Sequence, residues 1–191
     1  IQEDTTAGRY LQRRGGDSGY MVLVQVEDLA QEKARLRSSN IRIVWEVDLG
    51  PASALHLHPG DVPGAISSMD QMRPPAIWHW GGEDGGMAIP AARYVDAILA
   101  AEIESNNPQD TASKWARAYD RDIRAIEGTL VMAMEGTEIR FVPTTTDRAP
   151  GLSSIDLRTT DFDAVSRQAH SLGLPVQDRS VCVCGTRLRF C

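Results

Sequence analysis

The sequence of 191 residues lacks any run of about eighteen apolar residues, the length that a membrane-spanning helix needs, so we expect no membrane partner. It also lacks a basic cluster, and its net charge of -6 argues against nucleic acid as a partner. Its three cysteines all lie in the last ten residues and do not form a disulfide framework. Of these, Cys182 and Cys184 fall on one face of a predicted strand and are interpreted as buried thiols. These features predict a soluble globular protein of the reducing cytoplasm.

The sequence contains no G-x-G-x-x-G pattern, no P-loop and no nucleophile elbow, so the usual nucleotide-binding and hydrolase signatures are absent. It does contain enough apolar material for a core, since 42% of the residues are hydrophobic. At this length we expect one large or two small domains. The chain begins with Ile1 rather than Met and shows no apolar leader there, which predicts a fragment that lacks an N-terminal part.

Residues 53–70, SALHLHPGDVPGAISSMD, predict a strand, a tight turn and a second strand. Leu55 and Leu57 lie on one face of the first strand, because successive side chains alternate. His56 and His58 lie on the other face. We expect the leucines to be buried and the histidines to face a cavity or solvent, so this hairpin needs a partner surface.

The order of one strand, one helix and three strands is predicted three times. The first copy covers residues 17–72, with Asp28 as the helix cap, and two further copies share residues 91–191. Residues 1–16 are interpreted as a connector, and residues 73–90, rich in Gly and Pro, as a linker. The period of roughly 55 residues exceeds the 20 to 50 of stacked solenoids, so paired modules that share a sheet are favoured.

These features resemble the vicinal oxygen chelate superfamily, the glyoxalase, bleomycin-resistance and extradiol-dioxygenase fold of paired βαβββ modules. The resemblance rests on YMVLVQVEDL and LHLHPGDVPGA in the first copy, and on RYVDAIL and GLSSIDL at the start of the later copies. It implies an α+β protein whose repeated βαβββ modules form cupped mixed sheets. Because such folds hold even numbers of modules, three copies imply that one N-terminal module is absent. The unpaired first copy then predicts a homodimer in which two first copies pair.

The resemblance also implies a divalent metal, since metal-using members place a His on the first strand and a Glu or Gln on the fourth strand of each module. Aligned by the turns, these positions hold Met21 and Ser68, Asp96 and Arg140, and Ser154 and Arg189. Asp96 is the one candidate ligand among them, because a guanidinium group offers no lone pair. We therefore expect the paired modules to lack the usual metal.

Arg140 and Arg189 predict a different ligand. If both point into the cupped sheet, the pseudo-symmetry of the modules places them near each other, where they would grip a carboxylate or a phosphate. The alternative is that they are solvated at strand ends, or that they pair with Glu138 and Asp156.

His56 and His58 are the candidate metal ligands elsewhere, because two imidazoles at alternate strand positions are able to share a metal, with His79 as a third ligand. Alternatively, they line the groove or form hydrogen bonds at the turn without a metal. Trp78 and Trp80, on either side of His79, are candidate ligand-binding residues as a stacking wall for a flat ligand. Their alternative role is to pin the linker onto the core.

The sequence therefore predicts a glyoxalase-like small-molecule-binding protein, whose ligand is acidic if Arg140 and Arg189 face it. Two other classes stay open: a metal-dependent lyase, isomerase or dioxygenase that uses the histidines of the first copy, and a resistance protein that sequesters a drug without turnover. Glu102 and Glu104 follow a strand predicted over residues 94–101 and are interpreted as solvated. Whether the chain is an enzyme is not readable, since this fold hosts many chemistries.

Overall fold

The computed structural model describes residues 5–81, 94–145 and 150–191. Within them, the order of strand, helix and three strands occurs three times, after α1 (Thr6–Arg14), and the short helix η1 (His79–Gly81) follows the first module. The elements of the first module are β1 (Met21–Gln25), α2 (Leu29–Ser38), β2 (Ile43–Asp48), β3 (Ala52–Leu57) and β4 (Ile66–Met72). Those of the second are β5 (Val95–Ser105), α3 (Pro108–Tyr119), β6 (Ile123–Ile126), β7 (Thr129–Met134) and β8 (Thr137–Pro143). Those of the third are β9 (Gly151–Thr159), α4 (Phe162–Ser171), β10 (Val176–Gln177), β11 (Ser180–Val183) and β12 (Thr186–Phe190).

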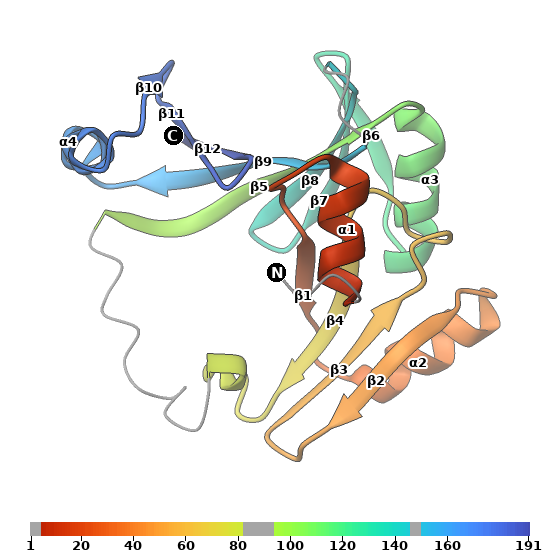
Figure 1. The fold of residues 1–191 in the computed structure, drawn as a ribbon. Helices are drawn as coiled ribbons and strands as arrows, with labels where there is room; N and C mark the ends of the chain where they lie inside the picture. The colour runs from red at the N-terminus through yellow and green to blue at the C-terminus, as the bar shows by residue number, and fades with distance from the viewer. Residues whose placement is uncertain (1–4, 82–93, 146–149) are drawn as a thin grey trace.

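The strands form two sheets, shown in Figure 1. The first module makes a four-stranded sheet in the order β1-β4-β3-β2, and the other two modules share an eight-stranded sheet in the order β10-β11-β12-β9-β5-β8-β7-β6. In every module the first and fourth strands are parallel neighbours. At the centre of the eight-stranded sheet, β5 and β9 pair antiparallel, so the first strands of two modules form a seam. The architecture is α+β with mixed sheets, as predicted.

Each module helix begins at a polar side chain that caps it. Asp28, Asn107 and Asp161 accept hydrogen bonds from the backbone N–H three residues later, at 2.9, 3.1 and 2.9 Å. Such caps satisfy one of the N–H groups that the first turn of a helix leaves unpaired. They also mark the same point in each module, which provides a reference for aligning the three first strands.

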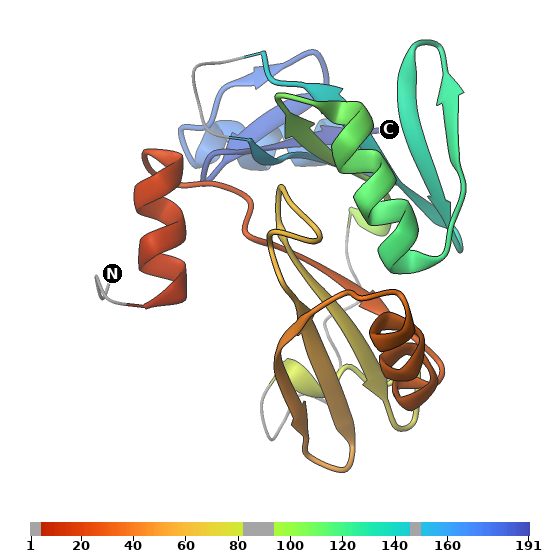
Figure 2. The same ribbon diagram turned by 90° about the vertical axis from the view of Figure 1, so that its right-hand side faces the viewer.

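The helix α1 lies beside the two sheets, as Figure 2 shows. Thr5 caps its start, and Gly15, with a left-handed φ of 69°, ends it. The Tyr10 hydroxyl donates to the carbonyl of Gly19 at 2.5 Å. Gly19 in turn forms an antiparallel bridge with Leu152 of β9, so this connection ties the start of the first module to the third.

One hydrophobic core joins the first module to the second. Leu55 of β3 and Trp115 of α3 belong to it, and both are 0% exposed. The indole of Trp115 donates to the carbonyl of Pro63 at 2.7 Å, and the Tyr119 hydroxyl shares a hydrogen bond with Ser67 of β4. Since α3 also packs on the strands of its own module, it lies between the two sheets. No helix of the described ranges is long and apolar enough to cross a membrane.

Candidate functional site

A cluster of charged side chains lies at the seam of the eight-stranded sheet, on the face turned away from α3. Ile103 and Phe141 pack into the core with α3, so alternation turns their neighbours Glu102 and Arg140 to the opposite face. From β12, Arg189 reaches the same face through its pairing with β9. The name seam cluster is used below for five residues: Glu102, Glu138, Arg140, Asp156 and Arg189.

Asp156 bridges the two arginines of the seam cluster. Its Oδ2 accepts a hydrogen bond from Nη1 of Arg140 and its Oδ1 accepts one from Nε of Arg189, both at 2.5 Å. Arg140 Nε also donates to Glu138 at 2.6 Å, and Arg189 Nη2 donates to Glu102 at 2.8 Å. One carboxylate therefore holds arginines from two modules side by side. The pairing of these arginines with Glu138 and Asp156, predicted from the sequence as an alternative, is part of the same network.

Burial in the seam cluster is greatest at Asp156. The side chain of Asp156 is 6% exposed, whereas those of Arg140 and Arg189 are 28% and 31% exposed. Desolvation opposes the charge of Arg140, but hydrogen bonds to Glu138 and Asp156 outweigh it and raise its pKa. The pKa of Arg189 is raised in the same way, against desolvation, by Asp156 and Glu102. Both arginines are charged, so two cations and three carboxylates give the cluster a net charge of 2 - 3 = -1.

Each arginine of the cluster keeps one terminal nitrogen for another partner. Arg140 uses Nε and Nη1, and Arg189 uses Nε and Nη2, in the bonds described above. Nη2 of Arg140 and Nη1 of Arg189 donate no hydrogen bond within residues 5–81, 94–145 and 150–191. These two nitrogens are able to donate to an oxygen of a bound molecule.

The three modules can be aligned at the residue that lies five positions before each helix cap, on the first strand of the module. The residues at this position are Leu23, Glu102 and Asp156. Opposite them on the fourth strands lie Ser68, Arg140 and Arg189. The fourth-strand residues are the same as those aligned from the sequence. The first-strand residues differ, because the alignment from the sequence selects Met21, Asp96 and Ser154, which lie N-terminal to the positions that the helix caps define.

A divalent metal does not fit the seam cluster. At the two aligned positions of the paired modules, both fourth-strand residues are arginines, which offer no lone pair, and both first-strand carboxylates are engaged by them. In the part of the chain that the structure describes, no group of three or more His, Cys, Asp or Glu side chains is placed to hold a metal ion.

The candidate metal ligands of the first module occupy separate environments. The His56 ring lies against Trp45, with ring centroids 4.4 Å apart, and desolvation lowers its pKa while the charge of Asp70 opposes that shift. His58 follows the end of β3, and its Nδ1 accepts the backbone N–H two residues later at 2.9 Å. His79 lies in η1, 3.2 Å from a linker carbonyl. Among the described residues these imidazoles form no three-ligand group.

The two linker tryptophans take different places. Trp80 donates from Nε1 to Oδ2 of Asp70 at 2.6 Å, and Asp70 is 1% exposed and also accepts a hydrogen bond from Ser68. Trp78 lines a cavity of about 1450 Å³ that follows β1. Asp70 is a buried carboxylate that was not among the predicted site residues, because it is the last residue of the predicted hairpin, whereas β4 continues to Met72.

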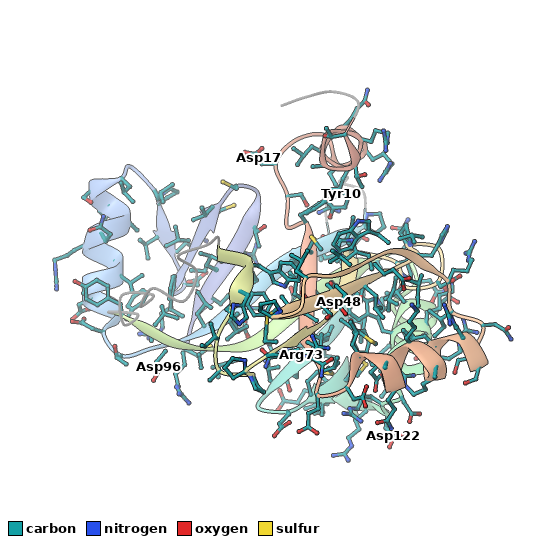
Figure 3. The ribbon with its side chains drawn as sticks, turned by 90° about the horizontal axis from the view of Figure 1, so that it is seen from below. Tyr10, Asp17, Asp48, Arg73, Asp96 and Asp122 are labelled. Atoms are coloured by element: carbon teal, nitrogen blue, oxygen red, sulfur yellow. The ribbon has the colours of Figure 1, made fainter. Side chains whose placement is uncertain are left out.

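Asp96 lies outside the seam cluster. It forms an ion pair of 2.7 Å with Arg158, and the side chains are 45% and 57% exposed, respectively. The hydrogen bond from Arg158 lowers the pKa of Asp96. Figure 3 shows Asp96 toward the α4 end of the molecule, apart from Asp48 of β2 and from Arg73, which follows β4. The structure therefore separates Asp96 from the other candidate ligand-binding residues.

Glu102 is the residue of the seam cluster that the sequence analysis interprets as solvated surface. Its side chain is instead 14% exposed, because β5 continues to Ser105 rather than ending at Ala101. Glu102 and Glu104 alternate with buried Ile103 in an ordinary half-buried strand pattern. The five-residue spacing to the helix cap is the signal that identifies Glu102 and Asp156 together.

The cysteines differ from the prediction of buried thiols. Cys182, Cys184 and Cys191 are free and exposed. The strand β11 ends at Val183, and Cys184 occupies the following turn with a positive φ of 46°. The turn removes Cys184 from the strand alternation, so the prediction of buried thiols on one strand face is wrong.

The three βαβββ units and the eight-stranded sheet of two modules define a glyoxalase-like fold, that of the vicinal oxygen chelate superfamily, as the sequence resemblance implies. One similar solved structure is a hypothetical protein from Staphylococcus aureus, with a TM-score of 0.62 and 13% identity over 98% of this chain and 73% of that chain. A Mn(II)-bound glyoxalase from Novosphingobium aromaticivorans has a TM-score of 0.58 and 11% identity over 89% of this chain and 61% of that one. A mutant 4-hydroxymandelate synthase from Streptomyces coelicolor has a TM-score of 0.57 and 14% identity over 90% of this chain and 57% of that one.

At these identities the similarity shows the fold alone. The chain spans less than two thirds of the glyoxalase and of the synthase, at 61% and 57% of their lengths. No model of a protein family matches the chain, and no curated protein matches it. Function has to be argued from the site itself.

Proposed function

We propose that the chain is a glyoxalase-like small-molecule-binding protein, in which the seam cluster replaces the metal-ligand positions of the superfamily and binds the acidic group of an organic ligand. The proposal depends on one observation: Asp156 holds Arg140 and Arg189 side by side, and each arginine keeps a terminal nitrogen without a hydrogen bond in the described residues. A carboxylate between the two guanidinium groups accepts an N–H from each. Because Asp156 orders both arginines beforehand, less side-chain freedom is lost on binding.

The net charge of the seam cluster restricts the chemical class of ligand that suits the site. The cluster carries a net charge of -1, so a simple anion adds negative charge beside Glu102 and Glu138. A ligand that also brings a hydroxyl group donates a hydrogen bond to one of these glutamates, which offsets the repulsion. Small hydroxy acids therefore suit the site better than inorganic anions. One such acid is 4-hydroxymandelate, after which one of the similar structures is named.

Isothermal titration calorimetry with 4-hydroxymandelate, lactate and inorganic phosphate tests this function. We expect a hydroxy acid to bind, and Arg140→Met and Arg189→Met each to weaken its binding by about tenfold or more, since a hydrogen bond to a charged group contributes about 1.5–3 kcal/mol. The matched control is Arg158→Met, which removes an exposed arginine of β9 and should leave the affinity unchanged. No binding of either hydroxy acid, or equal affinity in all three variants, contradicts the proposal.

We infer further that the protein works in the cytoplasm with a small molecule as its partner. Three exposed free thiols suit a reducing compartment. The homodimer predicted from the sequence stays a prediction, and light scattering of the purified chain across the micromolar range tests it. These inferences concern the cellular compartment and the partner, and they do not change the results expected from the calorimetric titration.

A further inference from the structure

The seam cluster lies in two neighbouring rows of side chains that cross the eight-stranded sheet. In the order β12, β9, β5 and β8, strand pairing places in the first row Arg187, Ser154, Glu102 and Arg140. In the same order, the second row holds Arg189, Asp156, Ala100 and Glu138. The two rows are two residues apart along each strand, which is roughly 6.6–6.8 Å. The first row therefore begins with two residues that the seam cluster does not include, Arg187 and Ser154.

Arg187 and Ser154 lie on the same face of the sheet as the seam cluster. Arg187 is two residues from Arg189 on β12, and Ser154 is two residues from Asp156 on β9, so strand alternation gives each pair one face. The intervening residue of β9, Ile155, packs against the hydrophobic core on the other face. Arg187 and Ser154 thus extend the seam cluster beyond the two positions at which the modules align.

Ser154 carries a buried hydroxyl group without a hydrogen-bond partner. It is 1% exposed, and its Oγ has no partner within the described residues. The neighbouring Ser153, by contrast, donates to the carbonyl of Glu102 at 3.3 Å. A buried hydroxyl without a partner is unfavourable, because it has lost its hydrogen bonds to water. Since Arg189 crosses β9 to reach Glu102, its side chain passes beside Ser154, and an oxygen atom that binds there would satisfy the hydroxyl.

Arg187 is a cation without a charged partner. It is exposed, and it forms no hydrogen bond or ion pair within residues 5–81, 94–145 and 150–191. Arg158, which lies on the other side of Asp156 on β9, is instead paired with Asp96 at 2.7 Å. The seam cluster has a net charge of -1, and with Arg187 the six residues sum to 3 - 3 = 0. The positive charge that is free to receive a second acidic group therefore lies at Arg187 rather than at Arg158.

We propose that the site binds a hydroxy acid with two acidic groups, the first between Arg140 and Arg189 and the second between Arg187 and the hydroxyl of Ser154. This inference rests on the function proposed above and narrows its ligand to short dicarboxylic hydroxy acids. The second acidic group accepts an N–H from Arg187 and the O–H of Ser154. Because the two rows are neighbours in the sheet, a short chain between the two acidic groups spans them.

Isothermal titration calorimetry with (S)-lactate and (S)-malate at one ionic strength tests the second subsite, because the two acids differ by one carboxylate. We expect malate to bind about tenfold more tightly than lactate, since the added contacts are hydrogen bonds between charged groups. The half-amide of malate, in which an uncharged amide replaces the second carboxylate, should lose most of this gain. It keeps the size of malate and so separates the effect of charge from that of contact area.

The matched variants separate the two arginines that flank the seam cluster. Arg187→Met should remove the tenfold preference for malate and change the affinity for lactate by less than about threefold, because lactate has no second acidic group. Arg158→Met should keep the preference. Ser154→Ala should weaken the binding of malate by about threefold or more. It should not lower the melting temperature, since it removes a hydroxyl group that has no partner in the free protein.

The outcomes distinguish this inference from the function on which it rests. Equal affinities for malate and lactate would contradict the second subsite and leave the binding of acidic ligands at the seam cluster in place. No binding of malate, lactate or 4-hydroxymandelate would contradict the proposed function itself, and this inference with it. A preference for malate that survives Arg187→Met, or that Arg158→Met abolishes, would place the second acidic group elsewhere and overturn the inference.

Discussion

Asp156 is the residue on which the seam cluster depends, because it contacts both arginines and its side chain is 6% exposed. Asp156→Asn removes the negative charge that two partly buried guanidinium groups share. We expect it to lower the free energy of unfolding in urea by about 2 kcal/mol, below the 3–5 kcal/mol of a fully buried pair. The control is Asp96→Asn, which breaks an exposed pair and should leave the free energy of unfolding nearly unchanged. Equal losses would mean that the seam cluster is an ordinary surface network.

His56 makes stability depend on pH. Desolvation lowers the pKa of its ring, against the charge of Asp70, so the folded protein favours the neutral form. Below the unfolded pKa of about 6.5 the unfolded chain binds more protons, so stability that is present above this pH is lost as the pH falls through the lower folded pKa. His56→Gln should therefore reduce the drop in melting temperature between about pH 7.5 and pH 5. The exposed His170→Gln should not, and an unchanged pH slope in His56→Gln would count against this account.

At the scale of elements, η1 is held on the first module by the bond from Trp80 to the buried Asp70. Trp80→Phe keeps the ring but removes the donor, so we expect a loss of about 1.5–3 kcal/mol in the free energy of unfolding. Trp78 is the matched control in the same segment, because it makes no hydrogen bond within the described residues. Trp78→Phe should cost less than about 1 kcal/mol. Equal losses of stability in urea for the two variants would contradict this role of the hydrogen bond from Trp80 to Asp70.

The helices were predictable from the sequence because their signals are local. The predicted helix cap at Asp28 is the residue that caps α2. A capping side chain and the N–H that it bonds lie within one turn of each other, so the chemistry is contained in a few residues. The three-fold module order follows from these signals and from the strand patterns between them.

The ends of the strands at the candidate sites were not predictable in the same way. Glu102 follows the strand predicted over residues 94–101, and Asp70 is the last residue of the predicted hairpin, so neither is predicted to lie inside a strand. Their burial depends on partners from distant segments, namely Arg189 for Glu102 and Trp80 for Asp70. Arg140 and Arg189 were predicted as site residues, with pairing to Glu138 and Asp156 as an alternative that the structure shows. That Asp156 contacts both arginines was not predicted, because it depends on the pairing of β5 with β9.

In the whole molecule, Gly64 lies where the first module packs on the second, so a substitution there tests that packing. It has a φ of 99°, and a Cβ there would collide with the side chain of Ile103 in β5. Gly50 has a φ of 84° and open space around it, which makes it a matched control. Gly64→Ala and Gly50→Ala share a backbone cost of about 1–2 kcal/mol, and Gly64→Ala should lose about 1–3 kcal/mol more through overpacking. Equal losses in urea unfolding would contradict the shared core of the two modules.

Binding of an acidic ligand at the seam cluster can be followed by NMR of the arginine side chains during titration with 4-hydroxymandelate. We predict that the Nε resonances of Arg140 and Arg189 shift with the same saturation curve, while that of Arg158 stays in place. Arg73 and Arg121 line the cavity along β1 and report binding there instead. Shifts confined to those two residues, or an absence of shifts at Arg140 and Arg189, would contradict the claim.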